Sequence, residues 1–146
     1  MAHGSPDHTR LSDDAYSHFQ DKWSYSPWGG LDAGDPANYI IDVSMVGLLG
    51  DIYVLCTDPG ISLKVAIDGT TIFSWDVATL ITLGLWGYSN NQMRMGCTSY
   101  NTVAKLYAMV FNANHQIYVH NTLQAWLVRS ALGDNAAGYL WYKEKI

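Results

Sequence analysis

The sequence predicts an all-β protein: an antiparallel β-sandwich of the jelly-roll type that carries an extended N-terminal arm. From Tyr39 onward, short apolar segments recur between turn residues at the spacing typical of sandwiches. One of these segments, "ISLKVAI" (residues 61–67), alternates between apolar and polar side chains as a half-buried strand does. Segments of helical period are too few for a layout of alternating strands and helices.

The first half of the domain divides into four candidate strands. The first two are "YIIDVSMVG" and "DIYVLCT", with Gly47 to Gly50 as their connection. The turn residues Asp58-Pro59-Gly60 precede "ISLKVAI". Asp68-Gly69 is a favoured hairpin turn, so the chain is expected to return as "TTIFSW".

The second half continues with strands and contains two ambiguous segments. "MRMGCTS" and "TVAKLYAMVF" are expected strands, and the second is apolar on both faces, which is typical of a central strand. Asn112-Ala113-Asn114 is expected to turn the chain into "QIYVHNT", and "GYLWYKE" closes the domain. Residues 77–87 and 123–132 fit either a helix or a strand.

The composition changes near Asn38 and divides the chain into an arm, residues 1–38, and a sandwich domain, residues 39–146. The arm holds six aspartates against one arginine and one lysine, and it is rich in glycine and proline. A short helix from Ser12 to Trp23 is one option within it. A disordered tail is usually poor in aromatic residues, whereas this arm contains Tyr16, Phe19, Trp23, Tyr25 and Trp28. We therefore expect these rings to contact either a neighbouring subunit or the arm's own domain.

Composition also limits the partners. The net charge is −5, and the few lysines and arginines are scattered, which argues against binding to nucleic acid or to an anionic membrane surface. Hydrophobic residues make up 49% and charged residues 14% of the chain, a balance that suits a protein burying part of its surface against other subunits. The N-terminus lacks the apolar segment of a signal peptide, and no apolar run is long enough to span a membrane, so we expect synthesis and retention in a cytoplasm.

No pattern of catalytic or metal-binding residues is found. His115 and His120 are separated by an odd number of residues, which places them on opposite faces of an unbulged strand. Cys56 and Cys97 lack the spacing of a metal or redox site, and they are either two buried thiols or one disulfide. A thiol dyad of Cys97 with a histidine, or two acids meeting across a cleft, are alternatives without support from the spacing. We expect no enzymatic activity, no catalytic residue, no metal and no cofactor.

An alternative function is carbohydrate or receptor binding through exposed aromatic side chains. The segment "WGYSNNQ" combines rings with neighbouring amides, as a platform for sugar rings requires. Its candidate ligand-binding residues are Trp86, Tyr88, Asn90 and Asn91.

The order of these segments resembles that of the small β-sandwich proteins of tailed-phage virions. The segments are "ISLKVAIDGTTIFSW", then "FNANHQIYVHNT" and the terminal "GYLWYKEK", within residues 39–146. The stretch "LQAWLVRSALGDNAA" departs from that pattern, and residues 1–38 match no motif of it. The resemblance implies a non-enzymatic capsid decoration (cement) or tail-accessory subunit located in the virion. Its implied partners are copies of itself, a trimer being one form, and a major capsid or other virion protein.

Overall fold

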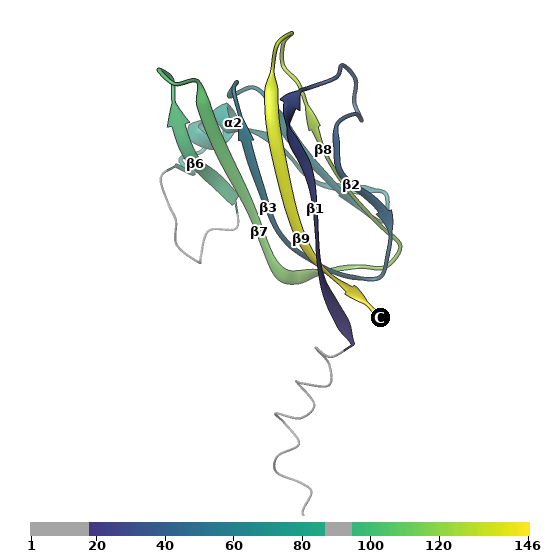
Figure 1. Cartoon of the computed structure of the whole chain (residues 1–146). Coiled ribbons are helices and arrows are strands. Elements are labelled where there is room, and N and C mark those ends of the chain that lie inside the picture. The colour runs from purple at the N-terminus through teal and green to yellow at the C-terminus, as the bar shows by residue number, and fades with distance from the viewer. Residues whose placement is uncertain (1–17, 87–94) are drawn as a thin grey trace, which may run out of the picture.

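The computed structural model describes residues 18–86 and 95–146 as two antiparallel β-sheets packed face to face, which confirms the all-β sandwich (Figure 1). The five-stranded sheet has the order β1 (Phe19–Gly30), β9 (Asn135–Lys145), β3 (Gly47–Cys56), β7 (Leu106–Val119) and β6 (Met95–Asn101). The four-stranded sheet has the order β2 (Tyr39–Ser44), β8 (Thr122–Val128), β4 (Ser62–Ile67) and β5 (Thr70–Asp76).

The strand pairing is that of a jelly roll. When the edge strand β6 is set aside, the first strand pairs with the last, β1 with β9, and the second with the next to last, β2 with β8. The pairs β3–β7 and β4–β5 complete the pattern. Pairing of β9 with β3 joins two of the pairs into the five-stranded sheet, and pairing of β8 with β4 joins the other two into the four-stranded sheet. The β4–β5 hairpin turns at Asp68-Gly69, as the sequence predicts, and both residues adopt positive φ angles of 52° and 85°.

The core lies between the two sheets and consists of the inward-facing residues of both. Alternation along the strands produces it: in β9, Leu140 is fully buried while its neighbours Tyr139 and Trp141 are exposed on the other side. The largest fully buried side chains are Leu49, Ile52, Ile61, Leu63, Leu80, Met109, Leu123, Leu127 and Leu140.

The two ambiguous segments adopt different structures. Residues Val77–Thr82 form the short helix α2, because the Asp76 carboxylate caps it by accepting a hydrogen bond from the Thr79 amide at 2.6 Å. Most of the other segment is strand β8, which is central in its sheet and buries Leu123, Ala125 and Leu127.

Two expected connections are wrong. Gly47 to Gly50 belong to strand β3 rather than to a loop. The chain does not turn at residues 112–114, because β7 continues to Val119 through a bulge opposite Gly50. Asn114 and His115 absorb this bulge with φ angles of 54° and 55°, the left-handed conformation that asparagine tolerates better than most residues.

The arm expected over residues 1–38 is in part a strand of the sandwich itself. Phe19–Gly30 form β1, which pairs with β9 in a register from Phe19 opposite Lys145 to Gly30 opposite Asn135. The boundary expected after residue 38 therefore does not mark the edge of the sandwich, and Phe19 to Trp23 are strand and not helix. Of the two expected contacts for the arm, these residues make the one with their own domain; residues 1–17 lie outside the described residues.

Candidate functional site

The outer surface of the five-stranded sheet carries a row of exposed aromatic side chains, which we call the aromatic face. Strand register places these rings on one side of the sheet, since Trp23 lies opposite Trp141, and Tyr25 and Tyr53 both lie opposite Tyr139. Tyr118 on β7 lies on the same side. It is opposite Leu48 of β3, which in turn is opposite the outward-facing Lys143 of β9. The aromatic face consists of Trp23, Tyr25, Tyr53, Tyr118, Tyr139 and Trp141.

The rings of β1 and β9 pack against one another and form a continuous layer. Trp23 stacks on Tyr25 with centroids 5.2 Å apart, and Tyr25 stacks on Tyr139 at 6.1 Å. Tyr139 then stacks on Trp141 at 6.2 Å, and the three pairs have interplanar angles of 15° to 24°. Mutual stacking holds the rings in place at little further entropic cost, but it occupies the ring faces that a sugar would need. The stacked ring faces are therefore less accessible to a sugar ring than those of isolated aromatic side chains.

Charged residues lie at one end of the aromatic face and are paired within the chain. Lys143 binds Asp21 at 2.6 Å, and the hydrogen bond from Lys143 lowers the pKa of Asp21. On the other side of the same two strands, Lys22 binds Glu144 at 2.6 Å, and this hydrogen bond raises the pKa of Lys22. The middle of β1 and β9 thus exposes an aromatic surface without charged groups, a composition typical of the core of an interface.

The outer surface of the four-stranded sheet differs in character. Its outward-facing side chains include Lys64 and Gln124, and Gln124 donates to Asp42 at 3.1 Å. Its tryptophan, Trp126, is only 8% exposed and donates its indole N–H to Asp35 of the β1–β2 loop at 2.8 Å. Lys64 also pairs with Asp35, so a loop of the chain itself covers part of this surface.

Of the aromatic residues that the sequence predicts as partner contacts of the arm, the structure places only some in the aromatic face. Trp23 and Tyr25 lie in the aromatic face, and Phe19 is half-buried at the start of β1. Trp28 is 49% exposed beside the irregularity between Ser26 and Gly29, and Tyr16 lies outside the described residues. Sequence reasoning missed the rings of β3, β7 and β9, although Tyr139 and Trp141 alternate with Leu140 in "GYLWYKE" and thereby signal an outward aromatic pair.

The alternative ligand-binding residues lie mostly outside the described part of the chain. Trp86 is 44% exposed and packs edge-to-face on Tyr100 at 6.2 Å. Tyr88, Asn90 and Asn91 fall in residues 87–94, which the structure does not describe.

Both cysteines are free, buried thiols. Burial raises the pKa of the Cys56 thiol to about 12, so it is not poised as a nucleophile. Burial also raises the pKa of Cys97, and the Cys97 thiol donates a hydrogen bond to the Ser99 carbonyl at 3.2 Å. Among residues 18–86 and 95–146, no three His, Cys, Asp or Glu side chains gather closely enough to hold a metal ion.

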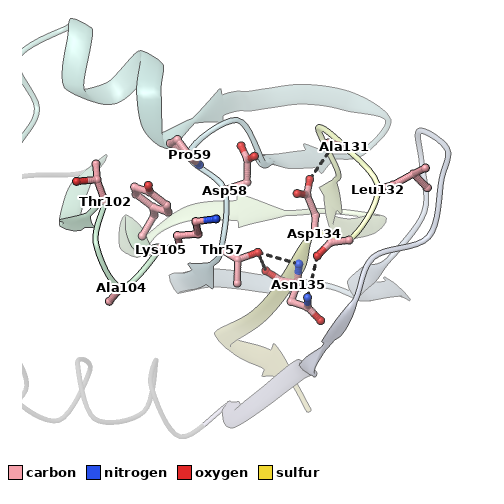
Figure 2. Close-up of a pocket in the computed structure, with 12 residues that line it drawn as sticks. Thr57, Asp58, Pro59, Thr102, Ala104, Lys105, Ala131, Leu132, Asp134 and Asn135 are labelled. Carbon is pink, nitrogen blue, oxygen red and sulfur yellow. Dashed lines mark hydrogen bonds between the residues drawn. The ribbon is translucent and has the colours of Figure 1, made fainter.

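A polar pocket of about 460 Å³ opens at one end of the sandwich, and we call it the loop-end pocket (Figure 2). Three connections form it: the one after β3, the β6–β7 turn, and the β8–β9 loop. Two hydrogen bonds between Thr57 and Asn135 join two of these connections. The Thr57 amide donates to the Asn135 carbonyl at 3.0 Å, and the Asn135 amide donates to the Thr57 hydroxyl at 3.0 Å. The lining residues include Thr57, Asp58, Thr102, Lys105, Tyr107, Asp134 and Asn135.

Comparison with known proteins adds no family to this description: no protein-family model matches the chain, and no curated protein matches it. Within the described residues, no helix combines the length and the apolar character that crossing a membrane requires.

Proposed function

We propose that this chain is a non-enzymatic assembly subunit that binds copies of itself through the aromatic face. The observation that carries the proposal is the layer of stacked, exposed rings on β1 and β9, which lies on the side of the five-stranded sheet that faces away from the four-stranded sheet. The setting we propose is the surface of a tailed-phage virion, as a decoration or accessory subunit, where the sequence resemblance supports it. In that setting a major capsid or other virion protein is a further partner.

The size of the aromatic face agrees with this role. The exposed fractions of its six side chains, from 36% to 60%, correspond to roughly 500 Å² if a ring offers about 200 Å² in full. Large patches on monomeric proteins reach about 300–600 Å², and each partner of a stable complex buries about 800 Å². The aromatic face thus provides more than half of the area of a specific contact, and the residues around it would have to provide the rest.

Self-association is favoured because the aromatic face needs no charged counterpart. The nearby ionic groups Asp21 and Lys143, and Lys22 and Glu144, are already paired within one subunit. An uncharged aromatic centre can therefore meet the same surface of a second copy without burying an unpaired charge.

The test is the association of the full chain in solution, measured by sedimentation equilibrium up to about 200 μM. Trp141→Ser removes a ring that is 45% exposed, or roughly 100 Å² of contact area, which corresponds to about 2.5 kcal/mol. We expect this variant to weaken association at least about 30-fold.

Trp86→Ser is the matched control, because Trp86 is 44% exposed but is not part of the aromatic face. It should leave association unchanged, and circular dichroism should show that both variants are folded. A wild-type chain that stays monomeric over the whole concentration range would overturn self-assembly, as would equal weakening by both variants.

A further inference from the structure

The loop-end pocket contains polar groups that the fold positions but does not use fully. The Asp58 carboxylate is fixed by one of its oxygens, which accepts a hydrogen bond from the Gly60 amide at 2.7 Å. One oxygen of Asp134 accepts from the Ser130 amide at 2.7 Å, the Ala131 amide at 2.9 Å and the Ser130 hydroxyl at 3.1 Å. Among the described residues, the second oxygen of each carboxylate has no hydrogen-bond donor. The pocket is therefore lined by two oriented acceptors.

The donors of the pocket also lack partners. Lys105 stands at the β6–β7 turn with a φ angle of 52°, and it forms no ion pair with any residue that the structure describes. Tyr107 lines the pocket with its ring buried, and its hydroxyl is open to solvent and forms no hydrogen bond in the described parts of the chain. Burial raises the pKa of Tyr107, so the hydroxyl keeps its proton and can donate it.

The ring of Tyr107 is buried and therefore held in place, while its hydroxyl stays accessible from the pocket and can donate to a bound molecule. Figure 2 shows the side chains of Asp58, Lys105 and Thr102 together around the pocket. Its volume lies within the range of about 300–1,000 Å³ that small-molecule sites occupy.

The lining determines the chemical class of ligand. An anion would face the carboxylates of Asp58 and Asp134, and a cation would face the ammonium group of Lys105. A neutral ligand with adjacent hydroxyl groups avoids both conflicts, because each hydroxyl donates to a carboxylate oxygen and accepts from Lys105 or Tyr107. We propose that the loop-end pocket binds a neutral polyol, such as a monosaccharide unit.

This site is separate from the aromatic face and goes beyond the proposed assembly function. The pocket is formed by loops at one end of the sandwich, whereas the aromatic face lies on the outer surface of the five-stranded sheet. Sugar binding and self-association can therefore succeed or fail independently.

The test is a titration of the full ¹⁵N-labelled chain followed by NMR. The probes are glucose, galactose, mannose, N-acetylglucosamine and myo-inositol, each up to about 50 mM. We expect at least one probe to give saturable shifts of the Gly60, Ser130 and Ala131 amides, which lie next to the carboxylates, with a Kd of about 1–10 mM. Tyr107→Phe and Lys105→Gln should each raise this Kd roughly 3- to 10-fold.

Tyr100→Phe is the matched control, since Tyr100 contacts the Tyr107 ring at 4.9 Å but does not line the pocket. It should leave the Kd unchanged. The proposal is overturned if no probe gives saturable shifts, or if Tyr107→Phe and Lys105→Gln bind as the wild type does. It is also overturned if the pocket responds to glycine or lysine, as charged probes, and to none of the neutral ones.

Discussion

Gly138 is the position at which the packing of the two sheets can be tested most directly. It lies in β9 of the five-stranded sheet, and a methyl group at this position would meet Ile40 of β2 in the other sheet. The added carbon would lie 2.6 Å from Cγ1 of Ile40 and closer still to its Cδ1. Neither residue has room to yield, because Ile40 is 2% exposed and its branched side chain has few alternative conformations.

Gly138→Ala should therefore destabilise the fold by overpacking. Forcing one extra carbon into a packed core costs about 1–3 kcal/mol, and the lower entropy of unfolded alanine offsets up to about 1 kcal/mol. We expect a loss of about 2 kcal/mol in the free energy of unfolding, which lowers Tm by roughly 4–8 °C in a domain of this size.

The assay is a double-mutant cycle measured by urea unfolding and by thermal melts. Ile40→Ala alone should cost about 2–5 kcal/mol, because it leaves a cavity between the sheets. In the double variant the new methyl group occupies part of that cavity, so the double variant should be more stable than the sum of the single effects by about 1–2 kcal/mol.

Gly29→Ala on β1 is the control for the backbone effect alone, since the nearest atom to its added carbon is 4.0 Å away. It should change the free energy of unfolding by less than about 1 kcal/mol. Gly138→Ala with wild-type stability, or a strictly additive cycle, would refute the packing of β9 against β2.

Three further outcomes follow from single residues. The backbone hydrogen bonds from Thr122 and its two preceding residues lower the pKa of Asp68, so this carboxylate stabilises the fold above its unfolded pKa of about 4. Asp68→Asn should thus be less stable than wild type at pH 7 in urea unfolding, and the difference should shrink as the pH falls below about 4. Cys56, whose pKa is about 12, should react with a thiol reagent at pH 8 only after denaturant is added; immediate reaction in the native state would contradict its burial. Asp134→Ala removes the acceptor of three hydrogen bonds near Ser130 and should cost about 2–3 kcal/mol by urea unfolding, whereas an effect below about 0.5 kcal/mol would show that water replaces them.

The sequence predicts the fold class well because local patterns and tertiary pairing agree over most strands. The alternation in residues 61–67 and the Asp68-Gly69 turn are local signals, and the β4–β5 hairpin forms where they indicate. Residues 123–132 fit either a helix or a strand because the outward-facing Trp126 and Val128 are also apolar and obscure the period of two. Burial of Leu123, Ala125 and Leu127 against the other sheet decides for a strand.

The errors concern positions where local signals and long-range pairing disagree. Asn112-Ala113-Asn114 has the composition of a turn, but pairing with β3 on both sides carries β7 through it as a bulge. Similarly, Pro27 and the glycines near it indicate an irregular arm, yet pairing with β9 makes Phe19–Gly30 a strand. A proline is tolerated there because β1 is an edge strand, whose outer side needs no hydrogen-bond partner.

The candidate site was predictable only in part. The sequence predicts Trp23 and Tyr25 as contact residues because aromatic rings stand out in a polar segment. Tyr139, which stacks on Tyr25, and Trp141 lie more than a hundred residues further along the chain, so only the register between β1 and β9 reveals the shared surface. The loop-end pocket likewise depends on three connections that meet in space and share no sequence motif.

The pairing of the first described strand with the last has a consequence for the order of events during synthesis. Most of the chain must leave the ribosome before Phe19 can meet Lys145, and pairings this distant in sequence are slow to form. The stacked rings of β1 and β9 therefore come together only after β9 has been synthesised, so the aromatic face is absent from shorter nascent chains.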